Sequence, residues 1–103
     1  MVLPDKVSKL ILPLLLATLP PVHLYAAFLG GDLGIGRMGE DHEVVFVVAE
    51  DAVSARRAAK AKWGGAGRPH VDALTRLMMV DGYTLDLVRE GQGDALETDG
   101  YDE

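Results

Sequence analysis

The stretch GIGRMGEDHEVVFVVA, residues 34–49, decides which fold this chain adopts. Its first six residues have the spacing G-x-G-x-x-G, which is typical of the first turn of a dinucleotide-binding βαβ unit. That turn needs a helix directly after the glycines, because the pyrophosphate binds at the helix N-terminus. Here the glycines lead into EVVFVVA, an apolar run rich in β-branched residues that predicts a central strand. We therefore predict a strand connection and no dinucleotide site, and we leave open that the loop amides and Arg37 hold an anion.

The residues on either side supply two further elements. HLYAAFLG, residues 23–30, is apolar at both alternating sets of positions and predicts a largely covered strand. EDAVSARRAAKAKW, residues 50–63, predicts a helix, because carboxylates stand at its start and two glycines follow its end. Its alanines allow the helix to lie close to a sheet, and Trp63 is expected to pack in the core rather than to stack on a ligand.

A hairpin is predicted at the end of the ordered chain. Asp81-Gly82 lies between LTRLMMV and YTLDLVR, and a type I′ turn needs positive φ at both central residues. Val80 then pairs with Tyr83, and the buried face of the last strand consists of Tyr83, Leu85 and Leu87. The order strand, strand, helix, strand, strand predicts an α+β fold, a two-layer ββαββ sandwich with one helix packed on a mixed four-stranded sheet. The N-terminal segment or a second copy of the protein is expected to cover the other face.

Charge divides the chain into regions. The net charge is −6, and residues 90–103 account for it with six acidic residues and no basic one, while residues 1–89 carry ten of each sign. We predict one α+β domain over 22–89 and a disordered acidic tail over 90–103. Without a concentrated basic region, no nucleic-acid binding is expected. The absence of cysteine excludes disulfides and thiolate metal sites, and it is compatible with the cytoplasm, where we place the protein.

Residues 1–21 form an apolar N-terminal extension that has three interpretations. Lysines precede its apolar part, as in a signal peptide, but cleavage at the only suitable site, near Ala26, would cut the first strand. The second interpretation is a membrane anchor, but prolines interrupt the apolar run, so no membrane association is expected. The third interpretation is an appendage, or residues that precede an unrecognised start codon at Val22.

Polar residues suited to binding or acid–base chemistry lie at two predicted strand ends. Glu40 and His42 follow the glycines, and His70 and Asp72 share a face if they begin a regular strand. Imidazoles and carboxylates suit a metal ion or acid–base catalysis, and the metal candidates are His42, His70 and Asp72. The alternative is that these residues only form polar contacts at strand ends. Neither serine has an adjacent histidine base, so no nucleophile is predicted.

A set of short motifs spans Val22 to about Arg89. It consists of LYAAFLG, Gly36-Arg37, Glu40-Asp41-His42-Glu43 before VVFVVA, a helix ending near Trp63, His70-Val71-Asp72 and Val80-Asp81-Gly82-Tyr83. With these motifs the chain resembles the small bacterial proteins of domain-of-unknown-function family 1543. The resemblance implies no known activity, but it implies that these residues belong to the family pattern: Arg37, Glu40, His42, His70, Asp72 and Asp81. The chain departs from the pattern in two ways, since Glu43 replaces Asp and Ala73-Leu74 stand where an aromatic residue is expected.

We therefore expect a small α+β binding or assembly module that needs no cofactor and forms a homo-oligomer through its open sheet face or an edge strand. Its partner besides a second copy is an unknown small ligand, and the candidate ligand-binding residues are Arg37, Glu40, His42, His70 and Asp72. The alternative is a metal-dependent or acid–base enzyme that uses Glu40, His42, His70 and Asp72, which requires His42 and His70 to converge.

Overall fold

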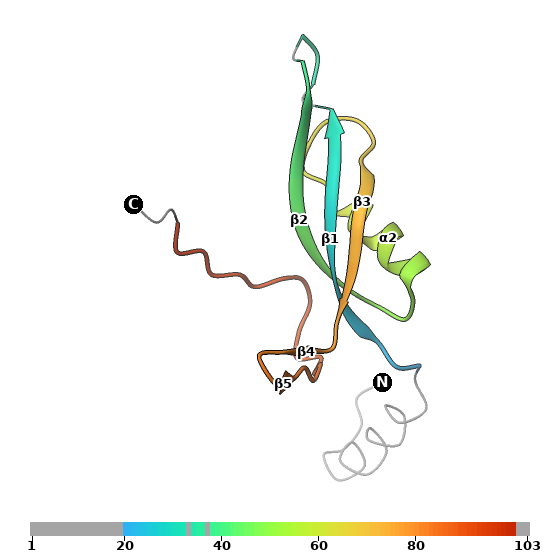
Figure 1. Ribbon diagram of the computed structural model, residues 1–103, viewed down its shortest axis with the longest axis vertical. Coiled ribbons are helices and arrows are strands. Elements are labelled where there is room, and N and C mark those ends of the chain that lie inside the picture. Colours follow the sequence, from blue (N-terminus) through green and yellow to red (C-terminus); the bar gives the residue numbers. More distant parts are fainter. Residues whose placement is uncertain (1–19, 33, 37, 101–103) are drawn as a thin grey trace, which may run out of the picture.

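The computed structural model describes residues 20–32, 34–36 and 38–100 of the chain (Figure 1). Most of the predicted N-terminal extension, and the candidate residue Arg37, lie outside these ranges. The described chain is α+β, as predicted, and has the element order β1, β2, α2, β3, β4, β5. No helix in this part of the chain is long and apolar enough to cross a membrane.

β1 (His23–Asp32) and β2 (Glu40–Ala49) form a long antiparallel hairpin. All ten residues of each strand are paired in one unbroken register, so the glycine cluster connects two strands, as its sequence predicts. Both strands reach further into the glycine-rich segment than expected. The connection needs glycine, because Gly34, Gly36 and Gly39 have φ angles of 112°, 79° and 96°.

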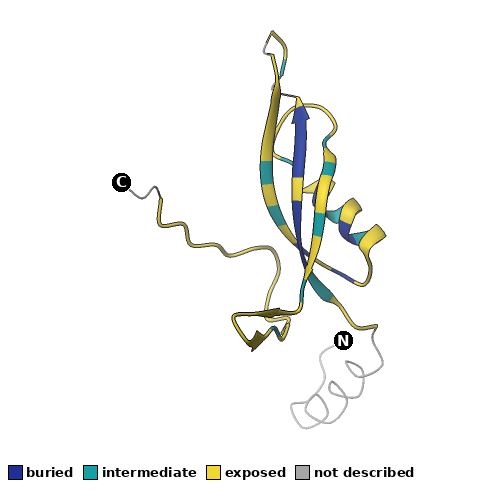
Figure 2. Ribbon diagram, viewed as in Figure 1, coloured by how far each residue is buried: buried dark blue, intermediate teal, exposed yellow. Residues whose placement is uncertain are grey.

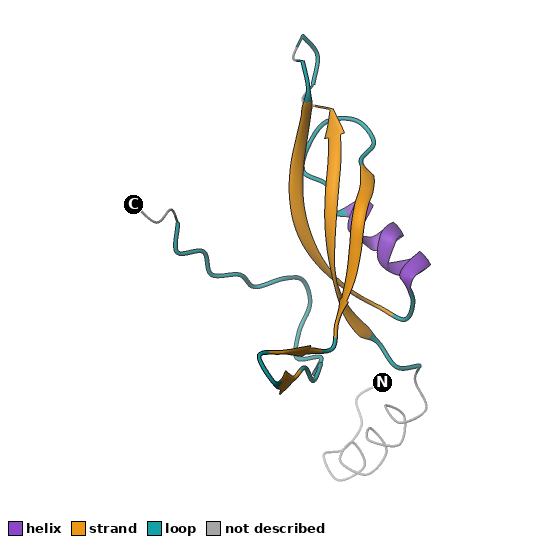
Figure 3. Cartoon of the chain, in the orientation of Figure 1, coloured by secondary structure: helices purple, strands orange, loops and turns teal. Residues whose placement is uncertain are grey.

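β3 (His70–Leu77) pairs antiparallel with the other edge of β1, which gives the strand order β2-β1-β3. Since both neighbours are antiparallel to β1, β2 and β3 run parallel to each other. α2 (Ala52–Ala61) connects them across one face of the sheet (Figure 3). Asp51 caps this helix, because its Oδ1 accepts a hydrogen bond from the Ser54 amide at 2.8 Å. That hydrogen bond lowers the pKa of the Asp51 carboxyl.

The core lies between α2 and the sheet face that the helix covers. Its buried residues are Tyr25, Ala27, Leu29, Val47, Ala49, Ala55 and Ala59. Ala55 and Ala59 have no exposed surface, so the helix backbone lies close to the strands. Figure 2 shows that most of the buried positions follow β1, the central strand.

Trp63 closes the end of this core, as predicted. Its indole packs against the buried cluster, and Nε1 donates a hydrogen bond to the carbonyl of Ala66 at 3.1 Å. Gly31 provides the space for the ring, since a Cβ at this position would lie 2.7 Å from an indole carbon. A larger residue in β1 would therefore push the ring out of place.

The predicted mixed four-stranded sheet does not form. In the described residues the main sheet has three antiparallel strands, and β4 (Met79–Val80) and β5 (Tyr83–Thr84) pair only with each other. The predicted turn is present, because Asp81 and Gly82 have φ angles of 52° and 84°. The predicted buried face is wrong, because Tyr83 is 77% exposed.

The correctly predicted turn does not bring the last strand into the main sheet, because a turn determines only the residues next to it. The Leu85 amide donates to the Met78 carbonyl at 3.1 Å, and no described residue after Thr84 belongs to a strand. The residues that follow include Asp86 and Arg89, whose charged side chains favour water over a sheet interface. The hairpin therefore forms without extending the main sheet.

In the described part of the chain, Asp94 of the acidic C-terminal segment forms an ion pair with Lys62 of the domain. Lys62 Nζ donates hydrogen bonds to the Phe46 carbonyl at 2.6 Å and to Asp94 Oδ2 at 2.9 Å. The segment around Asp94 is therefore held near the edge strand β2. The disorder predicted for residues 90–103 stays a prediction.

Candidate functional site

The sheet face opposite α2 carries a regular grid of uncharged side chains. Paired residues of antiparallel strands share a face, so the register places three rows across β2, β1 and β3. The rows are Val48–Leu24–Leu77, Phe46–Ala26–Thr75 and Val44–Phe28–Ala73. Four large members, Phe28, Val44, Phe46 and Val48, are 48–52% exposed. We call these nine residues the uncharged grid.

The row next to Val44–Phe28–Ala73 has histidines on both edge strands. His42 in β2 and His70 in β3 both pair with Gly30 in β1, so their imidazoles stand on the open face on either side of a residue that has no side chain. A Cβ at Gly30 would lie 2.8 Å from His70 Nε2 and 3.0 Å from Asp72 Oδ2. Gly30 therefore leaves the space that these polar groups occupy.

Asp72 reaches the same face through an irregularity in β3. Phe28 pairs with Ala73 and Leu29 pairs with Val71, which leaves Asp72 as an extra residue without a partner in β1. Such a β-bulge bends the strand and re-aims a side chain. His70 and Asp72 lie on one face, but through a bulge and not through the regular strand that the sequence suggests.

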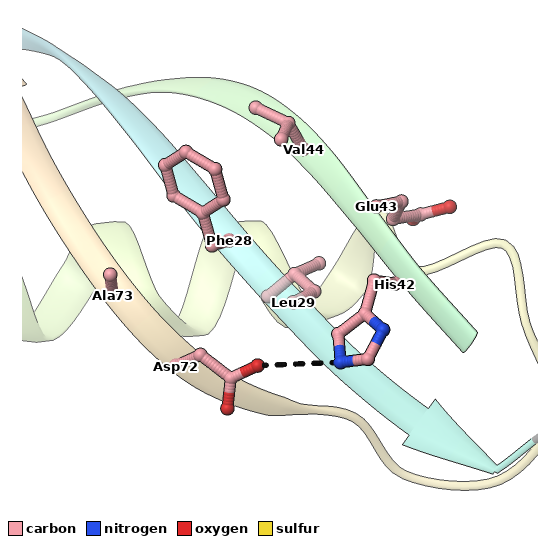
Figure 4. Close-up of a pocket in the computed structure, with 7 residues that line it drawn as sticks. All are labelled: Phe28, Leu29, His42, Glu43, Val44, Asp72 and Ala73. Carbon is pink, nitrogen blue, oxygen red and sulfur yellow. Dashed lines mark ion pairs between the residues drawn. The ribbon is translucent and has the colours of Figure 1, made fainter. Parts of the chain in front are cut away.

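The imidazoles of His42 and His70 alternate with the carboxylates of Glu40 and Asp72 around a ring. We call these four side chains the histidine–carboxylate cluster. Glu40 Oε2 lies 3.5 Å from His42 Nε2, and Glu40 Oε1 lies 3.6 Å from His70 Nε2. Asp72 Oδ2 lies 3.9 Å from His42 Nε2, and Asp72 Oδ1 lies 2.9 Å from His70 Nε2. The four side chains are 45–63% exposed, so solvent and small ligands reach them. Figure 4 shows His42 and Asp72 facing each other across β1.

An open hollow of about 530 Å³ lies where the cluster meets the uncharged grid (Figure 4). Its lining residues are Phe28, Leu29, His42, Glu43, Val44, Asp72 and Ala73. Apolar side chains form one side, and His42 and Asp72 form the polar end. Such a combination suits a small ligand, because apolar surface supplies contact area and a few polar groups fix its orientation.

Glu43 is on the opposite face and has a structural contact. Its Oε1 accepts a hydrogen bond from the Gly64 amide at 3.0 Å, which ties β2 to the chain that follows α2. The departure from the family pattern at this residue therefore lies outside the histidine–carboxylate cluster. Asp81, the last residue of that pattern, lies in the hairpin turn and not near the cluster.

The structure brings together four of the predicted ligand-binding residues, while Arg37 lies outside the described ranges. His42 and His70 converge on the same two carboxylates, as the enzyme alternative requires. Within the described ranges, no group of three or more histidine, aspartate or glutamate side chains is arranged so that it could hold a metal ion. Sequence reasoning missed Gly30 and the bulge. The available signal was Gly30 itself, since a glycine inside a strand often marks a bulge or a close approach.

Comparison with known proteins supports the resemblance seen in the sequence. The family described as Domain of Unknown Function (DUF1543) matches residues 37–87. The matched region includes β2, α2, β3 and the hairpin, and hence the whole histidine–carboxylate cluster. No curated protein and no solved structure matches the chain.

Proposed function

We propose that the protein is a small binding and assembly module that works through the open face of its sheet. The DUF1543 family, which matches residues 37–87, has a description that names no activity, so the proposal is argued from the site. A second copy packs on the uncharged grid, and the histidine–carboxylate cluster holds a small polar ligand. The observation that carries this proposal is the composition of the face: three uncharged rows border a cluster of two imidazoles and two carboxylates.

The charge pattern favours a second copy as the occupant of the grid. The chain has a net charge of −6, yet none of the nine grid residues is charged, so two copies bring these faces together without opposing like charges there. Sheets pack face to face through such surfaces, and a two-fold axis makes the contact self-complementary. From strand spacing the grid covers about 300 Å² per copy, well below the roughly 800 Å² of a standard interface. Association through the grid alone is therefore weak.

Sedimentation of the wild type and two lysine variants tests the assembly. Phe46→Lys puts a charge in the middle row of the grid, so the weight-average mass should stay at the monomer value at every concentration. Val53→Lys changes a 67% exposed helix residue and should associate like the wild type. A wild type that remains monomeric at high concentration, or a Phe46→Lys variant that associates equally well, contradicts the assembly.

The charge of the cluster favours a cationic ligand. The cluster contains two carboxylates, Glu40 and Asp72, and no lysine or arginine, and it presents nitrogen and oxygen atoms to the solvent. A cation or a hydrogen-bond donor is attracted to such a site, and an anion is repelled.

One contact favours acid–base catalysis as the second candidate function. Asp72 Oδ1 lies 2.9 Å from His70 Nε2, and a carboxylate at this distance can orient an imidazole for proton transfer. The neighbouring hollow leaves room for a substrate. Turnover of chromogenic esters or phosphomonoesters that is lost in both His70→Ala and Asp72→Asn supports catalysis. Turnover that survives in both variants contradicts it.

A further inference from the structure

We infer that the histidine–carboxylate cluster binds a divalent transition-metal cation of the Zn²⁺ type through His42 Nε2, His70 Nε2 and the carboxylates of Glu40 and Asp72. This inference rests on the proposed role of the cluster as the ligand site of the module, and it names the class of that ligand.

The donor atoms stand almost as far apart as ligands of one ion. Nitrogen and oxygen ligands lie about 2.0–2.2 Å from zinc, so neighbouring ligands are about 2.9–3.5 Å from each other. The four nitrogen–oxygen separations around the cluster are 2.9, 3.5, 3.6 and 3.9 Å. As they stand, the described side chains are not arranged to hold a metal ion, so binding requires them to move. Small rotations of these half-exposed side chains bring the wider pairs to ligand distance.

The backbone places the donors independently of the glycine-rich loop. His42 and His70 belong to the two edge strands, and Gly30 between them leaves the centre of the row empty. The bulge adds Asp72 to the same face. A glycine inside a strand and a bulge weaken the sheet at this row, although the bulge also places Val71, the partner of Leu29, against the core on the other face. An ion held at this row explains why a glycine stands between the two histidines.

The donor types select the class of cation. Mixed imidazole and carboxylate ligands suit zinc and its neighbours, whereas Mg²⁺ and Ca²⁺ prefer oxygen ligands alone. A divalent ion also balances the two carboxylate charges. The hollow beside Phe28 and Val44 keeps one side of the cluster accessible, so the bound ion retains a position for water or a small molecule.

Cobalt and zinc titrations of the full chain test the inference. The protein is first freed of metal with a chelator, and the absence of cysteine excludes binding by thiolates. Co²⁺ should bind one per chain with the visible absorption of a nitrogen–oxygen site, and Zn²⁺ should compete with it and raise the Tm. Mg²⁺ should do neither.

Histidine variants identify the ligands. His42→Ala and His70→Ala should each weaken Co²⁺ binding by at least about tenfold. The matched control is His23→Ala, because His23 is the third histidine of the chain and stands at the start of β1, away from the cluster. Far-ultraviolet circular dichroism verifies that each variant is folded.

Two results would overturn the inference. The first is that neither Co²⁺ nor Zn²⁺ binds at millimolar concentration. The second is that binding is unchanged in a His42→Ala, His70→Ala double variant, because the ion is then held by other carboxylates. Self-association is measured separately on metal-free protein. Failure of the metal site and failure of the assembly are therefore distinguishable.

Discussion

Two adjacent glycines in β1 serve opposite faces of the sheet. A Cβ at Gly30 would lie 2.8 Å from His70 Nε2 on the open face, whereas a Cβ at Gly31 would lie 2.7 Å from the Trp63 indole on the helix face. The partner of Gly30 is the end of a half-exposed side chain that can move into solvent. The partner of Gly31 is a ring packed against the core. The same added methyl group should therefore have different effects at the two positions.

Alanine substitutions separate these two roles. Gly30→Ala should change the free energy of unfolding by less than about 1 kcal/mol, because His70 moves aside, but it should weaken Co²⁺ binding. Gly31→Ala should lower the free energy of unfolding by about 1–3 kcal/mol, because the indole cannot move without losing packing. Urea denaturation measures the free energy of unfolding of both variants. Gly91→Ala is the control, because no heavy atom lies within 4 Å of a Cβ at that position. Equal losses at positions 30 and 31 would contradict this assignment.

At the scale of elements, α2 depends on a charged cap. The Ser54 amide donates to Asp51 and lowers the pKa of this carboxyl in the folded state, so the charged form stabilises the fold. That contribution is fully present above the unfolded-state pKa of about 3.9 and is lost as the pH falls through the lower folded-state pKa. Acidification should therefore destabilise the helix through Asp51.

An asparagine variant isolates this effect. Asp51→Asn keeps a side-chain oxygen as the cap but removes the charge, so the Tm difference between wild type and variant should shrink as the pH falls from 6 to 2. Asp86→Asn changes an exposed carboxyl in the segment after the hairpin and serves as the control. A Tm difference for Asp51→Asn that is constant over this range would show that the cap charge does not contribute.

The hairpin of β4 and β5 should be separable from the main sheet. Gly82 has a φ of 84°, which alanine adopts only with strain, so Gly82→Ala should open the hairpin and abolish the hydrogen-exchange protection of the Leu85 amide. Asp81→Asn should preserve it, because asparagine tolerates positive φ. Protection of the β1 amides should be unchanged in both variants. If Gly82→Ala also unprotects β1, the hairpin is part of the same cooperative unit.

The elements that the sequence predicts correctly are those with local causes. β-branched residues after the glycines, the carboxylate before the alanine-rich helix and Asp81-Gly82 each determine the chain next to them. The position of β5 depends on contacts with residues far away in the sequence, and in the described chain Tyr83 is exposed and no residue after Thr84 belongs to a strand. The bulge at Asp72 depends on the register between β1 and β3, which no single motif contains.

At the scale of the whole molecule, the two faces of the sheet have different roles. One is covered by an alanine-rich helix with Trp63 at its end, and the other remains open from Val48 to the histidines. The residue types of the candidate site were predictable from the motifs around His42 and His70. Their convergence was not, because it depends on two strands that flank the same glycine. We propose that function belongs to the open face.

Nuclear Overhauser spectroscopy of the isotope-labelled protein tests the central claim most directly. That claim is that His42 and His70 meet on the open face across Gly30. The account predicts cross-peaks from the ring protons of both histidines to the α-protons of Gly30, together with β1–β3 contacts that skip Asp72. Ring protons of either histidine that instead contact Trp63 or α2, or a β1–β3 register without the bulge, would contradict it.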